Sequence, residues 1–251
     1  MAGPVSPTNA DTARWAPLGR ALTDYHRGAK HSSFIVHSDL WDDEPTPVEE
    51  YYRPDHVPIP DLELRALLLC RGRVLDLGAG AGRHALELQA RGHEVTAVDI
   101  SRDAVAVMRE RGVDDARCGE LGAVLGERFD TILLLMHGIG LVGTISGLAD
   151  FLERAHEVLD TDGRIVCDSA DLSVILPSLL DTDERSDSGP TPYPGEVEFR
   201  LTYGALEGRA YPWLFVDPLT LRRFAEAAGF QFAIGAQGAR GAYVAILYRV
   251  K

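Results

Sequence analysis

The chain has 251 residues, 45% of them hydrophobic and 25% charged, which suffices for one α/β domain with added segments but not for two large domains. Its formal net charge is −13 at pH 7, and no run of Lys and Arg exceeds two residues, which argues against a nucleic-acid partner because such partners require clustered cations. No apolar stretch approaches the roughly 18 residues of a membrane span, so we expect no membrane partner.

The N-terminal region contains one periodic segment. Residues 1–12 are rich in Pro, Ala and Thr without periodicity, which predicts a disordered tail. Four apolar residues then recur at intervals of three and four: Trp15, Leu18, Leu22 and Tyr25. This spacing predicts an amphipathic helix that packs on the rest of the protein. Prolines and aromatic residues follow up to residue 60.

The most informative segment is a short apolar run that ends in a glycine-rich turn. Residues 73–77 are typical of a buried parallel strand, and a helical pattern begins at Arg83. Between them, three glycines occupy alternate positions: Gly78, Gly80 and Gly82. Glycine is needed where the backbone adopts positive φ or where a ligand contacts the main chain. The segment therefore predicts a strand, a ligand-binding turn and a helix in succession.

A second predicted strand, residues 94–98, is followed by Asp99. An acid at this distance from the glycines accepts hydrogen bonds from ribose hydroxyls in open α/β folds. The dinucleotide pattern G-x-G-x-x-G fails, because Arg83 stands where its third glycine would be. Asp76, two residues before the first glycine, would repel a pyrophosphate but could hold a positively charged amino group. These features favour a zwitterionic nucleoside that lacks phosphates.

This segment resembles the first motif of the class I S-adenosylmethionine-dependent methyltransferases, (V/L)-L-D-x-G-x-G-x-G, whose second strand also ends in an acid. The resemblance extends over residues 61–251. It implies S-adenosylmethionine (SAM) as cofactor, with Ile100 on the adenine and Glu120-Leu121 at the adenine edge after a short third strand. Glu120 replaces the commoner Asp. The cofactor-binding residues that the resemblance implies are Asp76, Gly78, Ala79, Gly80, Gly82, Asp99, Ile100, Glu120, Leu121 and Met136.

The remaining sequence completes the pattern of an α/β fold. A fourth strand is predicted over residues 129–136, a helix over 147–159, a fifth strand over 164–167, a helix from Asp217 to Gly229, and two last strands over 230–234 and 242–249. The last two strands are too close in sequence to pair in parallel. We predict a doubly wound, seven-stranded, mostly parallel sheet with an antiparallel C-terminal strand, an N-terminal helical lid and a small β insertion at about residues 171–211.

The resemblance also implies where an acceptor would bind. Segments before the first strand often form a lid in this family, so the resemblance implies a lid or cap over residues 13–60. This makes Tyr25 and Tyr52 candidate acceptor residues and Arg53 a candidate for the cofactor carboxylate. The alternative is that the aromatic side chains only anchor the N-terminal helix to the main body. In the insertion, residues 181–189 predict a loop and residues 195–203 a strand with one solvated face that pairs with 209–216. Its candidate acceptor residues are Asp168, Glu198, Tyr203, Tyr211 and Trp213.

His137 directly follows the fourth strand, at the sheet edge where ligands bind, and is the candidate general base. The alternative is a structural histidine. No metal site is predicted; Asp168 and Asp171 could serve a magnesium-dependent enzyme, although Asp171 fits a helix N-cap better. The lack of an Asn/Asp-Pro-Pro-aromatic sequence after the fourth strand disfavours methylation of DNA bases or glutamine.

The sequence thus predicts a methyltransferase that acts on a small-molecule acceptor by in-line displacement. The alternative is a protein of the same fold with a non-methylating role, since fold does not fix function. The three cysteines, Cys70, Cys118 and Cys167, are odd in number and lie in apolar context, so we expect reduced thiols and a cytoplasmic location.

Overall fold

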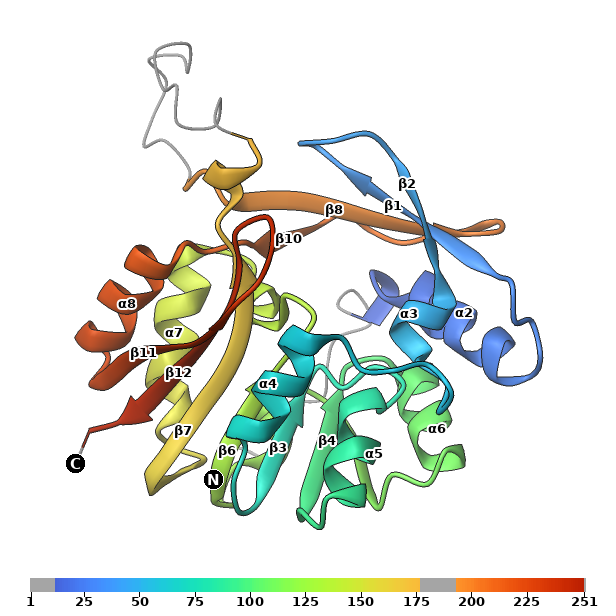
Figure 1. Cartoon of the computed structure of the whole chain (residues 1–251). Helices are drawn as coiled ribbons and strands as arrows, with labels where there is room; N and C mark the ends of the chain where they lie inside the picture. The colour runs from blue at the N-terminus through green and yellow to red at the C-terminus, as the bar shows by residue number, and fades with distance from the viewer. Residues whose placement is uncertain (1–11, 177–192, 251) are drawn as a thin grey trace.

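The computed structural model describes residues 12–176 and 193–250, and its main body is a twisted seven-stranded sheet (Figure 1). The strand order is β11-β12-β7-β6-β3-β4-β5. The five strands β3 to β7 are parallel, and β12 is antiparallel to both of its neighbours, β7 and β11. The predicted fold class is therefore confirmed. The strands of this sheet are β3 (Val74–Leu77), β4 (Val95–Asp99), β5 (Asp115–Cys118), β6 (Phe129–Leu134), β7 (Leu159–Ala170), β11 (Phe230–Gln237) and β12 (Ala242–Arg249).

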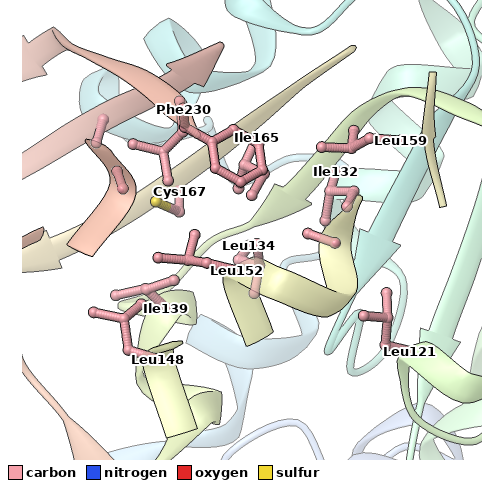
Figure 2. Packing of buried hydrophobic residues seen from close by; sticks show 14 of the residues in the cluster. Leu121, Ile132, Leu134, Ile139, Leu148, Leu152, Leu159, Ile165, Cys167 and Phe230 are labelled. Carbon is pink, nitrogen blue, oxygen red and sulfur yellow. The ribbon is translucent and has the colours of Figure 1, made fainter. Parts of the chain in front are cut away.

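Helices cover both faces of this sheet, and a separate hydrophobic core lies between the sheet and the helices on each face. On one face lie α4 (Asp61–Leu69), α5 (Arg83–Ala90) and α6 (Arg102–Glu110). On the other lie α7 (Ile145–Ala155) and α8 (Pro218–Ala227). Figure 2 shows part of the second core, where Leu148 and Leu152 of α7 lie with Leu134 and Cys167 of the central strands. A sheet buried on both faces accounts for the continuous apolar runs of its central strands.

Several predicted boundaries differ from the structure, and two of them concern the central strands β6 and β7. The fourth strand of the prediction extended to residue 136, but β6 ends at Leu134 because Met136 and His137 adopt positive φ values of 66° and 56°. The chain then enters a 3-10 helix, η2 (Gly138–Val142). The polar stretch 160–163 was expected to lie between a helix and a strand. It lies inside β7, since Phe129 pairs with Leu159 and an irregularity in the ladder absorbs the extra residues.

A second, antiparallel sheet joins two segments that are far apart in the sequence. Its order is β10-β8-β1-β2, and β9 (Leu206–Glu207) also pairs with β8. The N-terminal region contributes β1 (Ser33–Ser38) and β2 (Glu44–Pro47), while the insertion contributes β8 (Glu196–Tyr203) and β10 (Tyr211–Leu214). In Figure 1 these strands lie beyond the carboxyl ends of the central strands. The expected β insertion is present, but the sequence did not predict that it pairs with the N-terminal region.

Two helices complete this cap: α2 (Ala16–His26) and α3 (Val48–Tyr52). The expected amphipathic helix is α2, which packs closely on α6, since a Cβ at Gly19 would lie 2.6 Å from Oγ of Ser101. The guanidinium of Arg111 in the main body donates to the carbonyl oxygens of Tyr52, Arg53 and Ala81. The cap, meaning α2, α3 and the second sheet, is thereby tied to the main body. The expected N-terminal tail and the loop 181–189 lie outside the described residues.

Candidate active site

A cavity of about 340 Å³ lies at the carboxyl ends of the central strands, with α2 and β10 of the cap opposite them. Ligands of open α/β sheets bind at this edge. Most of the residues predicted to bind the cofactor line this cavity: Gly78, Ala79, Gly80, Asp99, Ile100, Glu120, Leu121 and Met136. Residues from four separate strand ends, chosen from the sequence alone, thus surround one space.

The glycine turn has the conformation that its sequence predicts. The three glycines have positive φ values of 79°, 55° and 77°. A Cβ at Gly80 would meet no other atom within 4 Å, so the backbone here faces open space. Gly82 instead caps α5, and a Cβ there would lie 2.7 Å from the side chain of Val113. Gly80 therefore faces the cavity, whereas Gly82, which does not line it, permits close packing of the helix.

The carboxylate of Asp99 is held by two backbone groups. Its Oδ2 accepts from the N–H of Gly80 at 2.8 Å, and its Oδ1 accepts from the N–H of Ser101 at 2.7 Å. Burial raises the pKa of Asp99, and the two backbone hydrogen bonds oppose this rise. Each carboxylate oxygen has a second lone pair, so the group can accept from two further donors.

Asp76 lies beneath the glycine turn and does not line the cavity. It is 1% exposed, and its Oδ2 has no hydrogen-bond partner among the described residues. Burial raises the pKa of Asp76 to about 6, against the opposing effect of the charge of His84. The strand buries this side chain away from the cavity lining, and its contact with the cofactor stays a prediction.

Two cavity residues that the sequence did not identify share one carboxylate. Nη2 of Arg83 and Nε2 of His84 each lie 2.7 Å from Oε2 of Glu63 on α4. Burial acts to raise the pKa of Glu63, but the hydrogen bond and charge of His84 and the charge of Arg83 hold it below its usual value. Both Arg83 and His84 line the cavity. The sequence could have identified Arg83 as a site residue, because it lies directly after the glycine turn.

The predicted lid residues Tyr25, Tyr52 and Arg53 do not line the cavity. The hydroxyl of Tyr25 donates to Oε1 of Glu49 at 3.2 Å, and the hydroxyl of Tyr52 lies 2.8 Å from Nδ1 of His26. Arg53 donates to the carbonyl oxygens of Val57 and Arg83 and pairs with Glu87 at 3.6 Å. These contacts are those of the alternative interpretation, in which the three side chains anchor the cap. The neighbouring Tyr51 lines the cavity in their place.

Aromatic side chains from the cap close the cavity opposite the strand ends. We call these the aromatic roof: Trp15, Tyr51, Tyr211 and Trp213. The ring centroids of Trp15 and Tyr211 lie 4.6 Å apart, and those of Trp15 and Trp213 lie 6.0 Å apart. Trp213 and Tyr211 were candidate acceptor residues, whereas Trp15 was expected only as part of a packed helix. Glu198 and Tyr203 do not line the cavity.

The candidate base His137 also lies outside the cavity lining. Its ring centroid is 5.3 Å from that of Phe215, and its buried Nδ1 has no partner among the described residues. Asp168 is 6% exposed, and its Oδ1 accepts from the N–H of Gly138 at 2.9 Å. Burial raises the pKa of Asp168, while the charge of His137 opposes this rise. Asp168 therefore holds the chain after β6 and does not face the cavity.

Asp171 accepts from the N–H of Ser173 at 3.0 Å, which is the capping role that its position favoured.

Within residues 12–176 and 193–250, no group of three or more His, Cys, Asp and Glu side chains could hold a metal ion. No helix in the same ranges is long and apolar enough to cross a membrane.

Comparisons with known proteins agree with this arrangement. A family model described as a methyltransferase domain matches residues 74–163, and no curated protein matches. A SAM-dependent methyltransferase from Bacteroides fragilis, solved in complex with S-adenosyl-L-homocysteine, is 35% identical, with a TM-score of 0.83 over 95% of this chain and 97% of the other.

Two more distant structures share the fold alone. The CcbJ methyltransferase from Streptomyces caelestis is 19% identical, with a TM-score of 0.57 over 78% of this chain and all of the other. The sugar N-methyltransferase KedS8 from a Streptoalloteichus species is 14% identical, with a TM-score of 0.55 over 86% and 97% of the two chains. On the strength of the first, closer relationship and the family model, the chain belongs to the SAM-dependent methyltransferases and is an enzyme of that family.

Proposed function

We propose that this methyltransferase transfers the methyl group of SAM to a small-molecule acceptor by in-line displacement. The observation that carries the proposal is the cavity, because it joins the glycine turn and Asp99 at one side to the aromatic roof at the other. Its volume of about 340 Å³ is within the range of small-molecule sites. The acidic net charge of −13 adds an argument against a nucleic-acid acceptor.

The residues present fit the cofactor. The open space at Gly80 lets a ligand approach the main chain, and Asp99 retains lone pairs for the two ribose hydroxyls. We assign Ile100 and Leu121 to the adenine faces and Glu120 to its edge. The buried guanidinium of Arg83 is the cation that would face the carboxylate of the methionine part. When bound, SAM supplies a methyl group on a positively charged sulfur, which leaves as a neutral thioether.

The protein's part in this reaction is mainly positional. An in-line displacement needs the acceptor atom close to the methyl group, aligned with the breaking bond and free of a proton. Orientation of two bound reactants can lower the barrier by about 7–11 kcal/mol. The cap places the aromatic roof over the strand ends, which holds an acceptor there and excludes water. A general base would add about 10²- to 10⁴-fold where the acceptor holds a proton, and His137 remains the predicted candidate.

Two measurements test the proposal. Calorimetric titration should show binding of SAM and of S-adenosylhomocysteine, and release of S-adenosylhomocysteine should depend on an added small molecule in a screen of acceptors. A methyltransferase should both bind the nucleosides and release S-adenosylhomocysteine with an acceptor, whereas a protein of the same fold with a non-methylating role should show no such release. Failure to bind either nucleoside would refute the cofactor assignment, and binding without release on any acceptor would favour the non-methylating role.

A further inference from the structure

The position of the acceptor follows from the two ends of the cavity, and this step rests on the proposed function. Asp99 is the last residue of β4 and Glu120 lies just after β5, and we assign both to the nucleoside end of the cavity. Arg83 and Met136 lie together at the ends of β3 and β6, where Nη1 of Arg83 is 3.3 Å from the sulfur of Met136. With the nucleoside and the methionine part assigned to these two places, we expect the methyl group to point toward the part of the cavity that the aromatic roof covers.

The roof offers flat apolar surface to whatever binds beneath it. Trp15 packs on Tyr211 at an interplanar angle of 41° and meets Trp213 at 67°, so the rings support one another in fixed positions. Trp213 lies directly against the backbone of Gly140, since a Cβ at that residue would overlap its indole. Aromatic rings held in this way bind other rings by offset stacking or edge contacts. The roof is thus matched to a planar, π-bearing ligand.

The polar groups of the roof are donors. No described residue forms a hydrogen bond with the hydroxyl of Tyr51 or of Tyr211. Burial raises the pKa of Tyr51 to about 12 and also raises that of Tyr211, so both hydroxyls keep their protons at neutral pH. Since both side chains line the cavity, these hydroxyls are available to donate to a ligand that brings hydrogen-bond acceptors to this position.

The carboxylates that line the cavity come from the main body of the protein. The carboxylates that line it are Asp99, Glu120 and Asp150. Asp150 lies on α7 one turn before Arg154, whose guanidinium reaches Gly122 beside the predicted adenine site. The described part of the cap contributes Arg14 to the cavity lining and no carboxylate. The described part of the cap therefore offers no carboxylate to a cationic amine under the roof.

We propose that the acceptor is a planar aromatic molecule that carries oxygen acceptors and no positive charge, as phenols and hydroxylated aromatic acids do. It stacks against Trp213 and Trp15 and accepts hydrogen bonds from Tyr51 and Tyr211. This class differs from the sugar acceptor named for KedS8, to which this chain is similar in fold alone.

A matched set of probes tests the class directly. Protein saturated with S-adenosylhomocysteine is titrated calorimetrically with 4-hydroxybenzoate, 3,4-dihydroxybenzoate and 4-hydroxycinnamate. The controls are 4-hydroxycyclohexanecarboxylate, which has a non-planar ring, and tyramine, which is aromatic but cationic. We expect at least one aromatic acid to bind about tenfold more tightly than both controls, the size expected from one good stacking contact. Equal binding of either control, or no binding of any aromatic acid, would overturn the proposal.

Variants locate the binding. Trp213→Leu should weaken the best probe about tenfold, while Trp41→Leu, a control whose ring packs on Phe199 outside the cavity lining, should leave it unchanged. Tyr51→Phe should weaken it, and the control Tyr248→Phe on β12 should not. All four variants should bind S-adenosylhomocysteine as the wild type does. If the wild type does not bind S-adenosylhomocysteine, the proposed function is refuted. If it binds and Trp213→Leu and Trp41→Leu weaken the best probe equally, only the acceptor class is refuted.

Discussion

The N–H of Gly80 donates to Oδ2 of Asp99 at 2.8 Å, so the glycine turn and the end of β4 are joined through one carboxylate. The same carboxylate is the group that we propose accepts from the ribose of SAM. On this proposal, one side chain both fixes the shape of the turn and binds the ligand that the turn receives.

Asp99→Ala should abolish most of the affinity for SAM. Two hydrogen bonds to a charged group are lost, each worth about 1.5–3 kcal/mol, so we expect a loss of at least 100-fold in affinity by calorimetry. The control is Asp114→Ala, which removes an exposed carboxylate outside the cavity lining. Circular dichroism should show that both variants fold, and unchanged affinity of Asp99→Ala would refute the ribose assignment.

Glu63→Gln should destabilise the protein by about 3 kcal/mol, because it removes the charge that Arg83 and His84 share in a buried position. Urea unfolding measures the change. Glu226→Gln is the matched control, since Glu226 pairs with Arg222 on the exposed surface of α8 and should cost less than about 1 kcal/mol. A similar, small cost for both variants would show that the buried cluster contributes little to stability.

The pH dependence of stability should reveal the buried Asp76. Its pKa is raised in the folded protein to about 6, from 3.8, so the folded state binds the proton more tightly than the unfolded state. This carboxyl therefore destabilises the fold progressively as pH rises from about 4 through 6, by on the order of 2–3 kcal/mol. Asp76→Asn should lack this decline when urea unfolding is followed from pH 4 to pH 8. Parallel profiles of variant and wild type would contradict the raised pKa.

Gly140→Ala should displace the indole of Trp213 into the cavity. Overpacking of this kind costs about 1–3 kcal/mol of stability. We expect binding of the best aromatic probe to fall while affinity for S-adenosylhomocysteine is retained. In a Trp213→Leu background the same glycine substitution should cost much less, because the overlapping ring is absent. Additive effects of the two substitutions would show that Gly140 does not position this ring.

His137→Ala should lower kcat with the true acceptor more than it changes affinity for SAM, if the residue acts as the base. A general base contributes about 10²- to 10⁴-fold. The comparison of kcat with the calorimetric affinity for SAM measures the difference. Equal turnover in the variant would remove His137 as base and leave it as a residue that packs on Phe215.

The cofactor half of the site was predictable from sequence because its signals are local. The glycine turn, Asp99 and Glu120-Leu121 each lie at or just after the carboxyl end of a strand, and parallel strands bring these ends to one edge. Asp76 was placed on the correct strand, but burial of a side chain within a strand depends on what packs over it.

The cap half was only partly predictable. Tyr51 and Tyr52 are neighbours on α3, so their side chains point about 100° apart, and the sequence did not show which one faces inward. The pairing of β1 with β8 depends on contacts between Ile35 and Thr202 and their neighbours, for which no short-range pattern exists. The positive φ values at Met136 and His137 were likewise invisible, because non-glycine residues seldom adopt them.

The pairing of β1 with β8 also determines the order in which parts of the fold can form while the chain is synthesised. Strands β3 to β7 leave the ribosome while β1 is paired with β2 alone, because β8 and β10 are translated later. Long-range strand pairs of this kind close slowly. The newly made polypeptide should therefore acquire its nucleoside-binding edge early and enclose an acceptor only at the end of its assembly.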